Sequence, residues 1–415
     1  MRIGIVGLGY VGLPLAVAFC EAGQEVTGVD VDTRVVDALA RGTSHVEDVP
    51  DAALAAMAGR FEATTRYADL AKVDAVIVAV PTPLTQNREP DLQPLIAAGT
   101  SLASVLQEGQ LVVLESTTYP GTTRERLLPM LEESGLAAGR DFYVAFSPER
   151  IDPGRTDYTM RNTPKVVGGV TQESLDRAVA LYELVCDDVI AVSTPEVAEL
   201  TKLLENVFRS VNIALVNELA ILCDRMGVDI WEVVESAATK PYGFMSFRPG
   251  PGMGGHCLPV DPFYLAWRAR EFDQPTEFIE LAGEVNQRMP YFCVEKIGRA
   301  LNDHAKPIKG SRIAILGVSY KAGVGDLRES PGLKIVRLLR DQGADVVYND
   351  DFVPELTDFD LTSEPLERLL ENADCAVIVT AHPGLDVEAI VAGVPLVVDF
   401  RGVTRGIEAP NLVRL

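Results

Sequence analysis

The sequence predicts an α/β protein with two doubly wound, Rossmann-like parallel sheets, joined by a long central helix and a helical middle domain. Short apolar runs alternate with helical patterns in both the first and the last third of the chain, which is typical of parallel βαβ units. The segment between them has a different, mainly helical pattern. At 415 residues the chain is long enough for two or three domains.

Nine apolar, β-rich runs are predicted to form buried strands. Five lie in the first part of the chain: Arg2–Val6, Glu25–Val29, Ala75–Val80, Leu111–Glu115 and Phe142–Phe146. Four lie in the last part: Arg312–Leu316, Asp345–Tyr348, Cys375–Thr380 and Leu396–Asp399. One long helix is predicted over Thr194–Met226, because Pro195 suits a first helical turn and Gly227 a helix end.

Helical structure is expected to continue to about Leu301, interrupted by a Pro/Gly-rich loop at Lys240–Pro262. The predicted domains are therefore an N-terminal α/β domain (1–193), a central helical domain that carries the cysteine loop described below (194–301) and a C-terminal domain (302–415).

The composition excludes several classes of partner. Asp and Glu number 60 against 37 Lys and Arg, a formal charge of −23, which argues against nucleic acid and an anionic membrane surface. We expect no signal peptide and no transmembrane helix, because no apolar run reaches about 18 residues, so the expected location is cytoplasmic. Six scattered cysteines without a CxxC pair predict neither a metal site nor a disulfide framework, and all but Cys257 are expected to be buried.

A glycine fingerprint follows the first predicted strand. Gly7, Gly9 and Gly12 form GxGxxG at the start of an apolar helix, an arrangement that binds a pyrophosphate at a helix N-terminus. Asp30 ends the second strand, where its carboxylate suits a ribose 2′-hydroxyl and favours NAD over NADP. Arg34 leaves NADP open, because a nearby arginine can accommodate the 2′-phosphate.

Cys257 lies in a glycine-rich loop, with His256 before it and Asp261 four residues after it. Glycines leave a thiol accessible, and a thiolate attacks carbonyl carbon well, so Cys257 is a candidate nucleophile. The alternative is a cysteine packed in a turn, and His256 is as compatible with turn packing as with chemistry.

Other polar residues are candidates for a role in catalysis or binding, and each also has a purely structural explanation. Lys202 and Asn206 share one face of the long helix, with Asn217 near that face. They could bind an oxyanion or a water in a cleft. Alternatively, they form an ordinary solvent-exposed helix face. Glu149 follows a strand and could assist proton transfer, or merely pair with an arginine. The basic groups Lys321 and Arg328 could bind a phosphate-bearing ligand. Alternatively, they belong to an ordinary solvent-exposed loop.

Together these motifs resemble the UDP-glucose/GDP-mannose dehydrogenase family over nearly the whole chain. The motifs are GLGYVG (7–12), STTYPGTT (116–123), FSPER (146–150), AELTKLLENVFR (198–209), GGHCLPVDP (254–262) and GDLRESP (325–331). The PGPGMGGHCLPVDPFYL segment is most similar to the UDP-N-acetylglucosamine 6-dehydrogenase branch. Val260 stands where glucose-type members have Lys, which supports that branch.

The resemblance implies two successive NAD-dependent oxidations of one sugar alcohol, a C-terminal UDP-binding domain and a homodimer built on the long helix. It implies these catalytic roles: Cys257 as nucleophile, Lys202 for the oxyanion, Asp261 and Thr117 for a water or a proton, Glu149 as general base and Asn206 for the sugar. For NAD it points to Gly7, Gly9, Gly12, Asp30, Arg34, Thr82, Thr117 and Arg328. For the UDP-sugar it points to Lys202, Asn206, Lys321 and the loop around Arg248.

Two other functions remain open. A two-electron NAD-dependent hydroxy-acid dehydrogenase needs no nucleophilic cysteine and no second α/β domain. In a non-catalytic NAD-sensing module, we would expect the reactive residues to be replaced. Here Cys257, Lys202 and Asp261 are all present. Counting the NADH formed per substrate separates the three functions. The four-electron dehydrogenase forms two, the hydroxy-acid dehydrogenase one and the sensing module none.

Overall fold

The computed structural model describes residues 1–85, 87, 89–151, 157–255 and 257–415, and the side chain of Cys257 lies outside this description. The chain divides into two compact units. The first consists of Met1–Glu205 and Phe263–Gln274, and the second of Asn206–Pro262 and Pro275–Leu415. The predicted three-domain division with boundaries near 193 and 301 stays a prediction.

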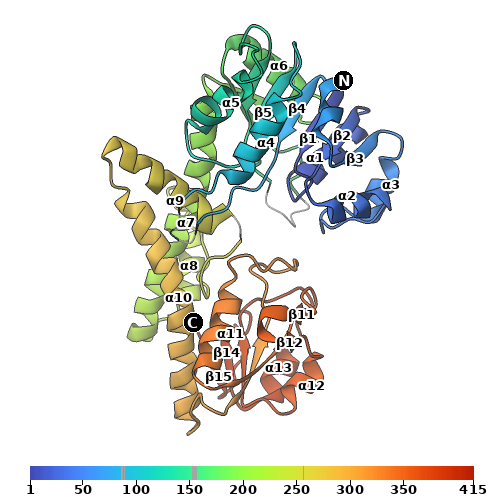
Figure 1. The fold of residues 1–415 in the computed structure, drawn as a ribbon. Helices are drawn as coiled ribbons and strands as arrows, with labels where there is room; N and C mark the ends of the chain where they lie inside the picture. Colours follow the sequence, from blue (N-terminus) through green and yellow to red (C-terminus); the bar gives the residue numbers. More distant parts are fainter. Residues whose placement is uncertain (86, 88, 152–156, 256) are drawn as a thin grey trace. The chain divides into compact units, whose positions relative to one another are not determined.

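The first unit contains a large, mostly parallel sheet with the strand order β3-β2-β1-β4-β5-β6-β7-β8 (Figure 1). Its strands are β1 Arg2–Val6, β2 Glu25–Val29, β3 Phe61–Thr64, β4 Ala75–Val78, β5 Leu111–Leu114, β6 Tyr143–Phe146, β7 Lys165–Gly169 and β8 Val189–Val192. All neighbours are parallel except β6 and β7. The five predicted strands are confirmed. The sequence analysis missed three strands: β3, which contains the polar residues Glu62 and Thr64; β7, whose apolar run is only Val166–Val167, between Lys165 and two glycines; and β8, whose four residues are half-buried or exposed.

Helices cover both faces of this sheet, which explains why its central strands are apolar throughout. On one face, Ile5 and Ile77 of the sheet pack with Phe19 of α1 and Leu181 of α6. On the other face the sheet packs against α4 and α5. The helices of this part of the chain are α1 Gly12–Glu21, α2 Thr33–Ala40, α3 Asp51–Ala56, α4 Gln93–Ala103, α5 Leu128–Glu132 and α6 Gln172–Tyr182.

The second unit contains a parallel sheet with the order β10-β9-β13-β14-β15. Its elements are β9 Arg312–Leu316, α11 Pro331–Asp341, β10 Asp345–Asn349, α12 Leu366–Leu370, β13 Cys375–Ile378, α13 Val387–Gly393, β14 Val397–Asp399 and β15 Leu412–Arg414; a separate small hairpin joins β11 Glu355–Leu356 and β12 Leu361–Thr362. The four predicted strands are confirmed. One face packs against α10 and α11, and the other against α12 and α13.

Long helices make up the middle of the sequence: α7 Pro195–Met226, α8 Ile230–Ala238, α9 Cys257–Ala269 and α10 Glu277–Asp303. The end of α7 is as predicted, because Gly227 has φ +66° and stops the helix. The predicted loop at Lys240–Pro262 is too long, since α9 already begins at Cys257 and contains Pro262. Pro259, the third residue of α9, lacks only an N–H that has no helical partner, whereas Pro262, the sixth residue, removes one helical hydrogen bond.

By length and composition, α7 could also cross a membrane, since its most apolar 18-residue window has a mean hydropathy of 1.3. Only 39% of that window is buried. The core helix of a soluble protein passes the same test, so the expectation of no transmembrane helix stays a prediction.

Candidate active site

The GxGxxG turn lies at the point where the strand order of the first sheet reverses, between β1 and β4. Gly7 has φ +92°, and a Cβ there would lie 2.5 Å from the carbonyl oxygen of Ala79. A Cβ on Gly12 would lie 1.8 Å from the oxygen of Gly7, whereas one on Gly9 would meet open space. Gly7 and Gly12 thus permit tight packing, and Gly9 leaves room for a pyrophosphate, so this turn fits NAD.

Asp30 is positioned by the backbone of the same turn. Its carboxylate accepts hydrogen bonds from the N–H groups of Leu8 and Asp32, both at 2.9 Å, and the residue is only half-buried. The exposed Arg34 is paired with Asp32 at 2.7 Å, and it lowers the pKa of that carboxyl to about 2. Arg34 thus pairs with the residue that caps α2, and Asp30 stays the predicted partner of the ribose diol.

The loops after β4 and β5 meet through two threonines. Thr82 is buried and donates a hydrogen bond from its hydroxyl to the carbonyl of Thr117, at 2.7 Å. The hydroxyl of Tyr264 in α9 donates to the carbonyl of Thr82. The buried Glu199 of α7 accepts hydrogen bonds from the loop after β5, at the N–H groups of Gly121 and Thr123 and the Thr123 hydroxyl. The sequence analysis missed Glu199, which holds this loop in place.

Glu149, after β6, belongs to a buried charge cluster that the sequence analysis missed. Its Oε1 accepts from the N–H groups of Arg150 and Ile151, and its Oε2 lies 3.3 Å from Nζ of Lys165. The same Nζ is 2.7 Å from the buried Glu115, which also accepts from the hydroxyl of Tyr182 at 2.7 Å. A lysine within an otherwise apolar strand was the available signal in the sequence.

The pKa values of the two carboxylates in this cluster are shifted in opposite directions. Burial pushes the pKa of Glu149 upward, but the charge of Lys165, the N–H of Ile151 and the charge of Lys202 together hold it below its ordinary value. Burial dominates at Glu115 and raises its pKa. Glu149 is therefore the carboxylate that stays ionised and available to a proton or a water.

The polar face of α7 is buried and is not a solvated helix face. Lys202 is 8% exposed, Asn206 4% and Asn217 0%. Within the part of the chain that the structure describes, the ammonium group of Lys202 makes no hydrogen bond or ion pair, although its charge acts on Glu149. A buried cation of this kind can stabilise a developing negative charge.

In the second unit, the Nδ2 of Asn206 donates to the carboxylate of Asp261 at 2.5 Å, and both side chains are buried. Asn217 holds the start of the cysteine loop, because its Oδ1 accepts from the N–H of Gly250 at 3.0 Å. The structure thus brings Asn206 to Asp261 rather than leaving its amide free.

Cys257 is the first residue of α9. The N-terminus of a helix favours a thiolate over a thiol. The preceding loop contacts the loop between β9 and α11, because the N–H of Gly255 donates to the carbonyl of Arg328 at 2.9 Å. Tyr320 fills the space beside Gly254 and Gly255, where an added Cβ would lie 2.6 Å and 2.9 Å from its side chain. His256 lies outside the described residues.

The other basic residues predicted to bind a ligand differ in their exposure and in their partners. Arg328 binds Asp326 through Nε and a terminal nitrogen, and Lys321 is half-buried. Arg248 is exposed, and its charge acts on Glu235. The sequence analysis missed Arg401, whose guanidinium packs against Gly250; burial lowers the pKa of Arg401.

The five other cysteines are free. Cys20, Cys186, Cys293 and Cys375 are buried as expected, but Cys223 is only half-buried. Within the described residues, no group of three or more His, Cys, Asp or Glu is placed to hold a metal ion.

The sequence matches the UDP-glucose/GDP-mannose dehydrogenase family in three consecutive segments. Residues 1–186 match its NAD binding domain, residues 196–288 its central domain and residues 314–406 its UDP binding domain.

Individual relatives agree with this match. A UDP-N-acetyl-D-mannosamine dehydrogenase of Pyrococcus horikoshii is 39% identical over 92% of this chain and 90% of its own. A UDP-N-acetyl-D-glucosamine 6-dehydrogenase of Pseudomonas aeruginosa is 38% identical over 85% and 83%. The solved structure of a UDP-D-ManNAc dehydrogenase from P. horikoshii has a TM-score of 0.92 and 35% identity, covering 100% of this chain and 99% of that one. With these matches and the nucleotide-binding geometry of its first sheet, the chain belongs to the UDP-glucose/GDP-mannose dehydrogenase family of NAD-dependent oxidoreductases.

Proposed function

We propose that this enzyme oxidises the C6 alcohol of a UDP-N-acetylhexosamine, with UDP-N-acetylglucosamine as the preferred substrate, to the corresponding uronate. The observation that carries the proposal is the match to NAD-binding, central and UDP-binding domains in one chain. The choice of sugar rests on the PGPGMGGHCLPVDPFYL segment and on Val260. UDP-N-acetylmannosamine is the second candidate, because the P. horikoshii relative named for it is 39% identical.

NAD supplies the hydride acceptor, held by Gly7, Gly9, Gly12, Asp30 and the loops at Thr82 and Thr117; Arg34 and Arg328 complete the predicted set. The alcohol carbon loses a hydride and its hydroxyl oxygen loses a proton, which gives an aldehyde. The thiolate of Cys257 then forms a C–S bond to that carbon, and the carbonyl oxygen takes up a proton to give a thiohemiacetal. Loss of a second hydride and a proton gives a thioester.

Water completes the sequence by breaking the C–S bond, which releases the carboxylate and the thiolate. In this proposal Glu149 is the general base for that water, a role supported by its ionised state beside Lys165. Lys202 stabilises the oxyanion, while Asp261, oriented by Asn206, and Thr117 hold a water or a proton. Each sugar consumes one water and two NAD.

The UDP-sugar is proposed to bind through Lys202, Asn206, Lys321 and the loop around Arg248. A homodimer is also proposed, because α7 carries an exposed apolar stripe that continues from one end of the helix to the other. The stripe consists of Val197, Leu200, Leu204, Phe208, Leu215, Leu219, Leu222 and Met226. A second copy of the chain could bury this stripe, and sedimentation equilibrium tests that part of the proposal.

A substrate panel tests the function. We would measure kcat/KM and NADH formed per sugar with UDP-N-acetylglucosamine, UDP-N-acetylmannosamine, UDP-N-acetylgalactosamine and UDP-glucose, at low and at molar salt. The proposal expects UDP-N-acetylglucosamine to be used best, with two NADH per sugar. A pocket that hydrogen-bonds the acetamido group can discriminate against glucose by several powers of ten. Preference for UDP-glucose contradicts the sugar assignment, and one NADH per sugar contradicts the covalent mechanism.

A further inference from the structure

The C-terminal sheet repeats a detail of the NAD-binding turn. Asp30 and Asp350 each follow the second strand of their sheet, and each accepts a hydrogen bond from the loop after the first strand. Leu8 N–H donates to Asp30 at 2.9 Å, and Val318 N–H donates to Asp350 at 2.8 Å. Asp350 is therefore the structural counterpart of the residue that suits the ribose of NAD.

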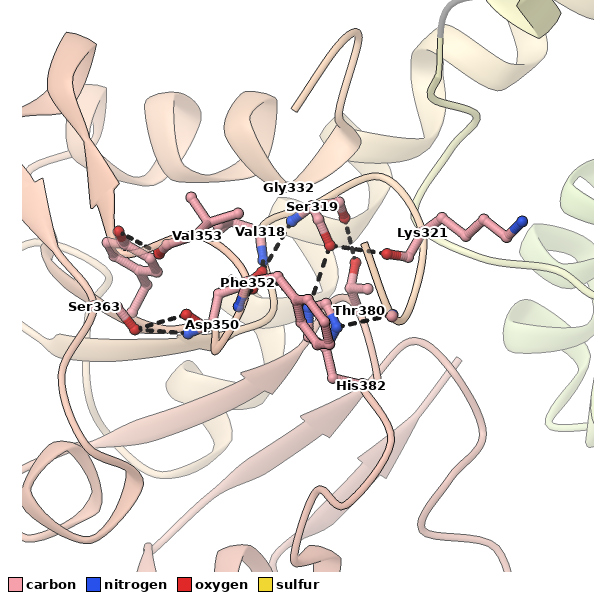
Figure 2. A network of polar contacts seen from close by, with 12 residues as sticks. Val318, Ser319, Lys321, Gly332, Asp350, Phe352, Val353, Ser363, Thr380 and His382 are labelled. Carbon is pink, nitrogen blue, oxygen red and sulfur yellow. Dashed lines mark hydrogen bonds and ion pairs between the residues drawn. The ribbon is translucent and has the colours of Figure 1, made fainter. Parts of the chain in front are cut away.

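The two acids differ in access. Asp30 is half-buried, whereas Asp350 is only 2% exposed. The Nε2 of His382, after β13, lies 3.0 Å from the Oδ2 of Asp350, and Phe352 stacks on the imidazole with ring centroids 4.8 Å apart (Figure 2). The carboxylate of Asp350 is thus paired with a side chain of the protein itself.

The hydrogen bonds of His382 determine its tautomer. The N–H of Gly323 donates to Nδ1 at 3.1 Å, so Nδ1 carries no proton. The proton is then on Nε2, which donates to Asp350, with the hydroxyl of Ser319 also 3.2 Å away. Both ring nitrogens are therefore in use.

These contacts fix the loop between Ser319 and Gly323 at both ends. Ser319 donates from its N–H to Asp350 at 3.1 Å and from its hydroxyl to the carbonyl of Lys321 at 2.9 Å. Gly323 is held by His382. Figure 2 shows the side chain of Lys321 extending away from this network.

We propose that His382 is a positioning residue for UDP: it accepts from Gly323 and holds the loop that presents Lys321 to the nucleotide. The inference rests on the proposed role of Lys321 in UDP-sugar binding. The same loop carries Tyr320, which packs against Gly254 and Gly255 of the cysteine loop.

Two substitutions separate positioning from general structure. His382→Asn retains an acceptor near Nδ1 for Gly323 but loses the donor to Asp350. His382→Gln retains a donor near Nε2 for Asp350 but loses the acceptor for Gly323. The probe is UDP alone, whose Kd is measured by titration calorimetry on the full-length protein, with the Kd for NAD and the melting temperature measured in parallel.

We expect His382→Gln to weaken UDP binding by about 5- to 10-fold, the effect of losing one hydrogen bond, and to leave NAD binding unchanged. His382→Asn is expected to keep the UDP Kd within about 2-fold even if its melting temperature falls. In a Lys321→Ala background, His382→Gln is expected to cause no further loss, because the two residues act through one contact.

Several results overturn the inference: equal effects of the two substitutions on UDP binding, an equal loss of NAD affinity, or a full additional loss in the Lys321→Ala background. If Lys321→Ala itself binds UDP normally, the proposed role of Lys321 fails, and the inference fails with it. A failure of the UDP-binding part of the proposed function is distinguishable, since the unmodified protein would then not bind UDP, and a wrong choice of sugar leaves the UDP measurement unaffected.

Discussion

Asn206 in α7 donates its amide hydrogen to the carboxylate of Asp261 in α9, across 55 positions of sequence. Because both side chains are buried, this amide orients a carboxylate that has little water around it. Removing it with Asn206→Ala is expected to cost about 1–3 kcal/mol of stability and to lower kcat at least about 10-fold. Chemical denaturation and steady-state kinetics measure the two effects.

Asn212→Ala is the matched control, since Asn212 lies on the same helix but, among the described residues, its amide bonds only to the carbonyl of Phe208. It is expected to change stability by less than about 0.5 kcal/mol and leave kcat unchanged. An Asn206→Ala enzyme as active as this control contradicts a role for the contact in catalysis.

Lys202→Met is expected to lower kcat by about 10²–10³, because the cation beside the developing oxyanion is lost. Stability is expected to hold or rise, since a buried ammonium group costs solvation and Met fills a similar volume. The Kd for NAD should not change. A variant with normal kcat would remove Lys202 from the mechanism.

Cys257→Ala is expected to abolish uronate formation, because no thioester can form. Residual turnover should stop at the aldehyde and yield at most one NADH per sugar, as measured by absorbance and mass spectrometry of the product. The control Cys223→Ala removes a half-buried thiol and should still give two NADH per sugar. Uronate formation by the Cys257→Ala enzyme at a near-normal rate would exclude the covalent route.

Lys165→Met is expected to move the acid limb of the pH–kcat profile to higher pH. In the unmodified enzyme the charge of Lys165 helps hold the pKa of Glu149 below its ordinary value of 4.5, so the base form persists into acid. Without that charge the pKa of Glu149 rises, and the base form is lost earlier as the pH falls.

The Lys165→Met substitution also leaves two buried carboxylates without their cation, which destabilises the fold. The double variant Lys165→Met/Glu115→Gln removes one charge of each sign and should restore stability while keeping the shifted profile. An unchanged acid limb in both variants would show that Glu149 is not the base that the profile reports.

The strands and the nucleotide-binding turn could be predicted because their signals are local. A buried parallel strand such as Arg2–Val6 is an apolar run, and Gly7, Gly9 and Gly12 meet backbone constraints within a few residues of themselves. The edge strand β3 escaped prediction because Glu62 and Thr64 break its apolar run, whereas the edge strand β8 is a short apolar run, Val189–Val192, that the sequence analysis passed over.

By itself, the sequence determined the two parallel sheets, the long helix, the NAD fingerprint and the family that carries Cys257. Only the tertiary structure decided what surrounds each candidate group. It placed Lys165 against Glu149, 16 positions away, and His382 against Asp350, 32 positions away. It also buried Lys202, for which the sequence had left a solvated face open. The physical reason is that burial and charge pairing depend on contacts between distant segments, and neither composition nor spacing specifies such contacts before the chain folds.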